Sequence, residues 1–434
     1  MIAAAPVPAA RPTASAPMPG LGARNAPPFI LPGEHFAAGL VFLLAGVAGL
    51  VWTAPLLASG FYSTTRVIGV AHLFTLGWIT TSIMGALYQF LPVATGQPIR
   101  SQKLAHVTFA LYAPGLAFFV AGLLLSRATP MLAGAAAFGT GVLLFAWNLA
   151  ATLKRATKHD VTWWALACAD FYLVVTLLLG LALAGNLRWG YLGGGRFDAV
   201  GTHLHVAIAG WVLLVMVGVG NRLLPMFLLS HGAGERFARA AVALIASGAG
   251  VLAFLHHAPA LISRWLPAVL LAAGVAAFLA QAALFYRHRH RPALDPGMRL
   301  VAAALALLGV GLALAGPMLL ADASARVATA YVLVVVLGIS LFVAAHYYKI
   351  VPFLVWYHRF GPLAGKRPVP RVNELYSSRL ASTAALLLVV GVVALAAAVL
   401  AGSAAVARVG AIVLAAGASI EATQMLLLSM RKPE

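Results

Sequence analysis

A chain of 434 residues is long enough for about three soluble domains, but its composition excludes that architecture. Hydrophobic residues make up 62% of the chain and charged residues only 9%, whereas soluble domains carry roughly 25% charged residues. So few charges cannot keep so much apolar surface in water, and the composition therefore indicates a polytopic, all-α membrane protein. The single cysteine, Cys168, excludes a disulfide framework and any cysteine-based zinc or iron–sulfur site.

The N-terminal segment, residues 1–33, differs from the rest of the chain. It contains eight prolines and two arginines, Arg11 and Arg24, and no continuous apolar run. Such a segment cannot bury enough apolar surface to fold, and it lacks the basic start and apolar core of a secretory signal. We therefore predict a disordered cytoplasmic tail over residues 1–33 and one membrane domain over residues 34–434.

From Glu34 onward, apolar runs alternate with short polar breaks. A helix that crosses a bilayer needs about 20 mostly apolar residues, and twelve runs meet this requirement. They are residues 35–58, 66–92, 104–126, 130–153, 162–186, 200–229, 238–256, 263–286, 298–320, 326–357, 378–401 and 404–430. The sequence thus predicts twelve transmembrane helices joined by short loops.

Lysine and arginine predict the orientation of these helices, because basic loops stay in the cytoplasm. With the N-terminus inside, 22 of the 29 basic residues lie on the inner side, which includes the run Arg287–Arg291. We therefore expect a multi-pass protein of the inner (cytoplasmic) membrane with both termini cytoplasmic. The net charge of +19 is then explained by topology and by contact with an anionic lipid bilayer. No nucleic-acid partner is predicted.

The second and sixth predicted helices carry an ungapped internal repeat, in which every matching position is separated by the same offset. The first copy has His72, Gly77-Trp78, Gly85 and Leu91-Pro92, and the second has His205, Gly210-Trp211, Gly218 and Leu224-Pro225. The tenth helix repeats the ending at Pro352, although its histidine position holds Val332. We therefore predict three pseudo-repeated arcs of four helices each.

Five histidines are expected at the same depth, in the outer third of the membrane. They are His72, His203, His205, His256 and His257. Neutral imidazole is a common ligand of copper and of heme iron, and an ionisable residue inside a membrane is a candidate functional site. The alternative is that His256 and His257 lie at the membrane interface and that His72 and His205 form hydrogen bonds between helices.

The second helix carries a resemblance to a known family. The runs AHLFTLGWI at residues 71–79 and MGALYQFLP at residues 84–92 resemble the second helix of the heme–copper oxidase superfamily, with nitric oxide reductase as the most similar branch. The run ATGQPI at residues 94–99 is also similar to an ending found in NnrS-type membrane proteins. The catalytic subunit of that superfamily has twelve helices in three four-helix arcs, so the resemblance covers residues 35–430.

This resemblance implies a heme, of the b type, with His72 as an axial ligand. It also implies copper held by His205 or His203 together with His256 and His257. A cytochrome c or another membrane subunit is then the implied protein partner, and the implied role is electron transport in a respiratory chain or the handling of nitric oxide or oxygen.

The sequence departs from the family in the tenth helix. There the family has a His-x-His motif that binds both hemes, whereas this chain has Ala330-Tyr331-Val332-Leu333. A conventional oxygen or nitric oxide reductase is therefore not expected, and oxidoreductase activity stays open. The resemblance implies a divergent member that binds heme, copper or both. The alternative is a transporter or metal-handling scaffold without redox turnover, since transporters are also built from repeats.

Among the outer histidines, we expect the ring of His205 to lie within reach of His256 or His257. Residues two apart on a helix point about 200° away from each other, so His203 is expected to turn elsewhere. The repeat favours His205 over His203 as the ligand, because His205 is equivalent to His72.

A second polar group is expected in the inner half of the membrane. It comprises Asp170, Glu421, His346, Arg222 and Lys349. Unpaired charges inside a bilayer cost about 2.5–3.5 kcal/mol each on insertion scales. The sequence therefore allows three interpretations: a proton route from the cytoplasm made of Asp170, Glu421 and His346, an ion network in which the carboxylates balance Arg222 and Lys349, or side chains that reach the inner interface.

Overall fold

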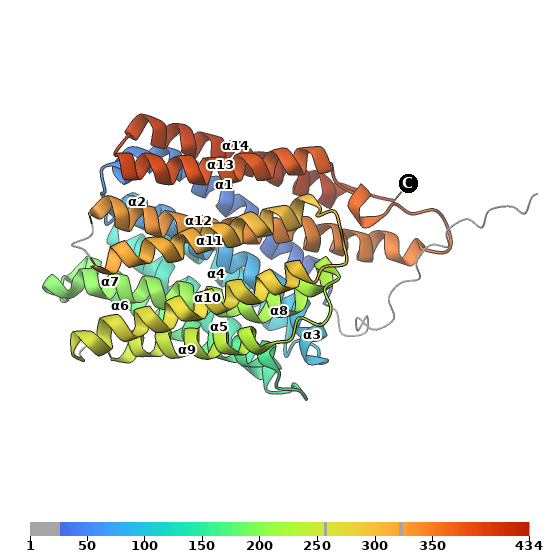
Figure 1. Ribbon diagram of the computed structural model, residues 1–434, viewed down its shortest axis with the longest axis horizontal. Helices are drawn as coiled ribbons and strands as arrows, with labels where there is room; N and C mark the ends of the chain where they lie inside the picture. Colours follow the sequence, from blue (N-terminus) through green and yellow to red (C-terminus); the bar gives the residue numbers. More distant parts are fainter. Residues whose placement is uncertain (1–26, 256–257, 321–323, 434) are drawn as a thin grey trace, which may run out of the picture.

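The computed structural model describes residues 27–255, 258–320 and 324–433, and this part of the chain forms an all-α bundle. Its helices run side by side along the long axis (Figure 1). The predicted twelve transmembrane helices are confirmed, because twelve helical segments of the described chain have the length and hydropathy to cross a membrane. The bounds of the main helices are α1 Ile30–Ala58, α2 Thr65–His72, α3 Thr81–Thr95, α4 Gln102–Leu124, α5 Ala128–Leu153, α6 Val161–Trp189, α7 Arg196–His205, α8 Leu214–Leu228, α9 Arg236–Phe254, α10 Leu266–Arg287, α11 Pro296–Leu320, α12 Ala325–Val355, α13 Ser378–Ala401 and α14 Ala404–Met430.

The first helix begins at Ile30, so residues 30–33 belong to the membrane domain rather than to the predicted tail. The rings of Phe29 and His358 pack with centroids 5.7 Å apart, which fixes this entry point against the end of the tenth span. The predicted disorder of the tail itself concerns residues 1–26, which lie outside the described residues.

Three spans form the centre of the bundle: span 2 (Thr65–Thr95), span 6 (Asp198–Leu228) and span 10 (Ala325–Leu363). In the most apolar window of each, 72% of the residues are buried, against 28–50% in the other nine spans. Two tryptophans of the repeat join them. The Nε1 of Trp78 donates to the Ser340 carbonyl at 3.3 Å, and the Nε1 of Trp211 donates to Thr80 Oγ1 at 3.2 Å.

Spans 2 and 6 share an irregular helix geometry. Each starts as an α-helix, widens into a π-helical segment and returns to α-helix. The π-helical segments are η1, Leu73–Thr80, and η3, Val206–Leu213. They occupy equivalent positions in the two copies of the sequence repeat, and each begins directly after a repeat histidine. The repeat therefore encodes a common backbone irregularity as well as common residues, and π-helical segments of this kind are frequent at functional sites.

Close helix packing recurs around the bundle with fixed spacing. A Cβ atom added at any of six glycines in the hairpins α4–α5, α9–α10 and α13–α14 would lie less than 3.0 Å from the facing helix. The glycines are Gly115 and Gly141, Gly248 and Gly274, and Gly391 and Gly417. The two glycines have the same spacing in all three pairs, and the second pair follows the first at the offset of the sequence repeat. This recurrence supports a relation among the three hairpins, while the assignment of all twelve helices to three arcs stays a prediction.

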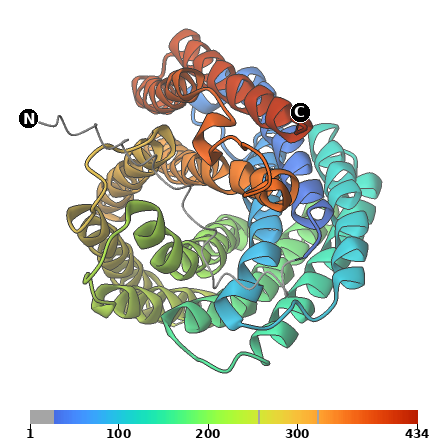
Figure 2. The same ribbon diagram turned by 90° about the vertical axis from the view of Figure 1, so that its right-hand side faces the viewer.

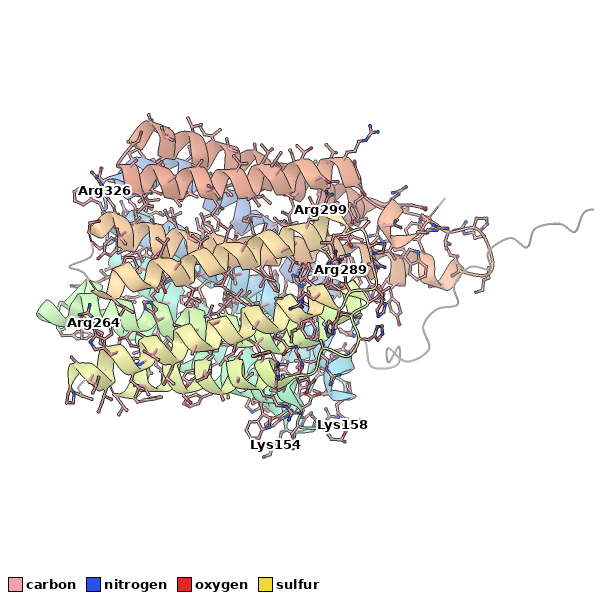
Figure 3. All side chains as sticks on the ribbon, viewed as in Figure 1. Lys154, Lys158, Arg264, Arg289, Arg299 and Arg326 are labelled. Carbon is pink, nitrogen blue, oxygen red and sulfur yellow. The ribbon has the colours of Figure 1, made fainter. Side chains whose placement is uncertain are left out.

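The bundle is seen from one end in Figure 2, where α13 and α14 form the rim beside α1. The last described helix ends close to the start of the first one. Arg359 donates to the carbonyl of Arg431 at 2.6 Å, and its guanidinium lies over the ring of Phe29. Lys154, Lys158, Arg289 and Arg299 lie toward that end, whereas Arg264 and Arg326 lie at the opposite one (Figure 3). We call the end with Arg264 and Arg326 the outer end, following the predicted orientation.

Candidate functional site

The outer half of the bundle contains a partly open cavity of about 400 Å³. Pockets for cofactors and small ligands usually measure about 300–1,000 Å³, so the space suits an organic cofactor better than a single ion. Its lining is mostly apolar and comes from α1, α4, α5, α6 and α12 together with spans 2 and 6. The polar residues toward its outer end include Tyr62, Ser63 and Asn186. This cavity is the candidate functional site.

Three of the five predicted histidines, His72, His203 and His205, line the cavity. His72 ends α2 and His205 ends α7, so each stands where its span changes from α-helix to π-helix. The sequence repeat therefore places equivalent imidazoles at equivalent irregularities on two central spans. The predicted convergence of these three residues is supported by the cavity that they share.

The hydrogen bonds of His72 determine which of its nitrogens is free. Its Nδ1 lies 2.7 Å from the carbonyl oxygen of Ile68. A carbonyl oxygen only accepts, so Nδ1 carries the proton and the neutral ring keeps its lone pair on Nε2. The ring packs edge-on against Phe119, with centroids 5.3 Å apart. His72 is thus an oriented imidazole with an available nitrogen at the cavity wall.

Like His72, His205 donates from Nδ1 to a carbonyl four residues before it, but its Nε2 also has a hydrogen-bond partner. Its Nδ1 donates to the carbonyl of Gly201 at 2.8 Å, and its Nε2 accepts from the hydroxyl of Tyr331 at 3.2 Å. Both nitrogens are therefore used inside the protein. Tyr331 was not predicted as a site residue. The only sequence signal that pointed to its segment was the absence of the family's His-x-His motif there.

The expected copper site includes His256 and His257, which lie outside the described residues, so the expectation that His203 turns away from that site stays a prediction. Within the described chain, His203 has a different neighbour from His205. It lines the cavity, and its ring lies nearly parallel to that of His72, with centroids 6.4 Å apart and planes at 20°. The helical argument that residues two apart diverge still holds. The cavity, however, surrounds this part of span 6 and is lined by Gly201, Leu204 and both histidines. Opposite sides of one helix therefore border the same space.

The predicted contact of His205 with His256 or His257 lies outside the described residues. Within residues 27–255, 258–320 and 324–433, no group of three or more histidine, cysteine, aspartate or glutamate side chains is placed to hold a metal ion. The described part of the chain therefore provides separate imidazoles around a large apolar space rather than a compact three-histidine centre.

The predicted ion network of the inner half is wrong in its pairings. Arg222 pairs with Asp160, and Lys349 pairs with Asp295. Both acidic partners lie in loops of the inner end, where Asp160 also caps α6 by accepting from the backbone N–H of Trp163 at 3.0 Å. Long basic side chains at span ends reach such interfacial carboxylates more easily than carboxyls inside the membrane. Asp170 and Glu421 therefore do not balance these cations.

Asp170 and Glu421 are buried without hydrogen-bond partners. Neither Asp170 Oδ1 nor either carboxyl oxygen of Glu421 bonds to a described residue. Glu421 borders a small cavity of about 10 Å³ beside Trp78 and Ser340, roughly the room that one water molecule needs. No hydrogen bond within the described chain joins Asp170, Glu421 and His346, whose Nδ1 donates to the Phe342 carbonyl at 2.7 Å. The proton route therefore stays a prediction.

Replacing Asp170 by asparagine is expected to leave the stability of the protein unchanged or slightly raised. Asparagine keeps the shape of the side chain and cannot ionise, so it removes the cost of a charge in apolar surroundings and leaves a polar group of similar size. Asp160→Asn is the matched control, because it removes the negative charge that pairs with Arg222 and lies at the N-terminus of α6, where such a charge is worth about 0.3–1 kcal/mol. Thermal unfolding of both variants in detergent measures the difference. An Asp170→Asn variant as unstable as Asp160→Asn would contradict the contacts described here.

Comparison of the sequence with models of known protein families gives no match, and comparison with curated proteins gives none.

Proposed function

We propose that this chain is a heme-binding membrane protein of the inner membrane, resembling a divergent heme–copper oxidase subunit, with a role in electron transfer or in the handling of nitric oxide or oxygen. His72 is the proposed axial ligand. The observation that carries the proposal is that His72 Nε2 is free for ligation at the wall of a large apolar cavity.

The chemistry of the site fits a heme on three counts. A porphyrin is flat and apolar over most of its surface, and the cavity lining is mostly apolar. Histidine is a usual axial ligand of heme iron, and hydrogen bonding of Nδ1 to the Ile68 carbonyl fixes the tautomer that leaves Nε2 for the iron. The polar residues toward the outer end, Tyr62, Ser63 and Asn186, suit the carboxylate edge of the group. When bound, the heme supplies one-electron redox chemistry.

Copper is a weaker part of the proposal. His205 uses both nitrogens for contacts with Gly201 and Tyr331, and the other expected ligands, His256 and His257, lie outside the described residues. The proposal therefore places heme first and gives copper no assigned ligand set.

The absorbance spectrum of the purified, full-length protein tests the proposal. Protein produced in cells that make b-type heme is expected to show a Soret band and, after reduction, sharp visible bands. Metal analysis of the same sample measures iron and copper. Protein that contains neither chromophore nor copper would contradict the proposal and favour the alternative, a transporter or metal-handling scaffold of the same fold.

A further inference from the structure

The pair formed by His72 and His203 is the most specific feature of the cavity. The two rings come from spans 2 and 6, lie nearly parallel and have centroids 6.4 Å apart. His203 packs against Gly180 of α6, where an added Cβ atom would lie 3.0 Å from the ring Cε1. A side chain at position 180 would therefore displace the ring from this position.

No hydrogen bond of the described chain joins the two rings. His72 bonds to Ile68 through Nδ1 and keeps Nε2 free, and the Nδ1 of His203 is buried without a hydrogen bond to a described residue. Leaving a buried polar nitrogen unpaired costs about 1–3 kcal/mol. Each ring therefore keeps a nitrogen that a bound group could use.

The separation of the rings matches one metal ion between them. A hydrogen bond between two imidazoles has nitrogen atoms about 3 Å apart, which brings the ring centres to roughly 5 Å. A metal ion with a nitrogen at about 2.0 Å on each side places the ring centres roughly 6.4 Å apart. The observed centroid distance, 6.4 Å, agrees with the second arrangement.

We infer that His203 is the second axial ligand of the heme whose first ligand is His72, so that spans 2 and 6 hold the iron between them. This inference rests on the proposed function. His203 would supply the second ligand that the resemblance places on the tenth helix. In this chain, the part of α12 that lines the cavity is mostly apolar and includes Val332, Leu333, Val336 and Leu337. His205 is not the ligand, because Tyr331 occupies its Nε2.

Two imidazole ligands leave heme iron no open position. With both imidazoles bound, such a site would favour one-electron transfer over the binding of oxygen, nitric oxide or carbon monoxide. The inference therefore narrows the proposed function to one-electron transfer and predicts that gas handling is absent.

Spectroscopy of the full-length protein and its variants tests this inference. The ferric wild type is expected to give the electron paramagnetic resonance signal of low-spin, six-coordinate heme, and the dithionite-reduced wild type should not change its spectrum under carbon monoxide. His203→Ala should convert the ferric iron to high spin and make the reduced protein bind carbon monoxide, and added imidazole should restore the low-spin signal. His346→Ala is the matched control, because this buried histidine lies outside the cavity, and it should behave as the wild type.

The outcomes separate the two proposals. A wild type without heme overturns the proposed function and this inference with it. Heme-loaded wild type that binds carbon monoxide, or His203→Ala that stays low-spin, overturns the inference alone. If His203→Ala loses its heme, it is incubated with hemin and imidazole and the unbound heme is removed. Low-spin heme that stays with the protein supports ligation by His203, and its absence contradicts ligation.

Discussion

Replacing His72 by alanine is expected to remove most of the heme from the purified protein, with a fall in heme-to-protein ratio of about tenfold or more. Each tenfold in affinity corresponds to about 1.4 kcal/mol, and loss of a direct iron–nitrogen bond should exceed the roughly 10–100-fold effects of losing groups that only orient a ligand. Under the proposed function, His72 would hold the cofactor on span 2, where Phe119 and the Ile68 carbonyl orient its ring. Soret absorbance per mole of protein measures the effect.

His346→Ala is the matched control for this experiment. His346 is a buried histidine with the same Nδ1 bond to the carbonyl four residues before it, but it does not line the cavity. Its replacement should leave heme content at the wild-type level, even if stability falls. Full heme loading and an unchanged spectrum in His72→Ala would overturn the assignment of His72. Equal losses in both variants would point to a general packing defect instead.

The second large effect is expected at Gly134, in the contact between α4 and α5. A Cβ atom there would lie 2.2 Å from the backbone nitrogen of Phe119 and 2.6 Å from the Gly115 carbonyl oxygen. Backbone atoms cannot move aside as a side chain can, so Gly134→Ala must push the two helices apart. Overpacking of this kind costs about 1–3 kcal/mol and sometimes more. Because Phe119 packs on His72, the variant should also disturb the heme spectrum.

Gly316→Ala is the control for the glycine prediction. Gly316 lies inside α11, and an added Cβ atom there meets no other atom within 4 Å. Alanine favours helix over glycine by up to about 1 kcal/mol, so this variant should unfold at the same temperature as the wild type or higher. Thermal unfolding in detergent compares the two. Equal midpoints for Gly134→Ala and Gly316→Ala would show that the α4–α5 contact is looser than described.

The twelve spans could be predicted from the sequence because each needs only a local property, a run of apolar residues as long as the bilayer is thick. The equivalence of His72 and His205 could be predicted for the same reason, since a repeat is a property of the chain itself. The π-helical segments after both histidines had no separate sequence signal, and the structure adds them to the repeat.

Of the interpretations that the sequence allowed for the inner polar group, the ion network is wrong in its pairs, because depth along a span says little about which neighbour a side chain meets. Arg222 and Lys349 were matched to Asp170 and Glu421, the carboxyls of the membrane interior. The structure gives them Asp160 and Asp295 in the loops. Flexible basic side chains at helix ends reach the interface, where the cost of holding a charge is lowest.

By itself, the sequence determined the membrane class, the twelve spans and the repeat histidines, because hydropathy and residue spacing are encoded locally. Only the tertiary structure decided what surrounds those histidines. The cavity borders both sides of span 6, so His203 meets His72 while His205 meets Tyr331. Such contacts join spans far apart in the chain, and they depend on how the central spans pack rather than on any one segment.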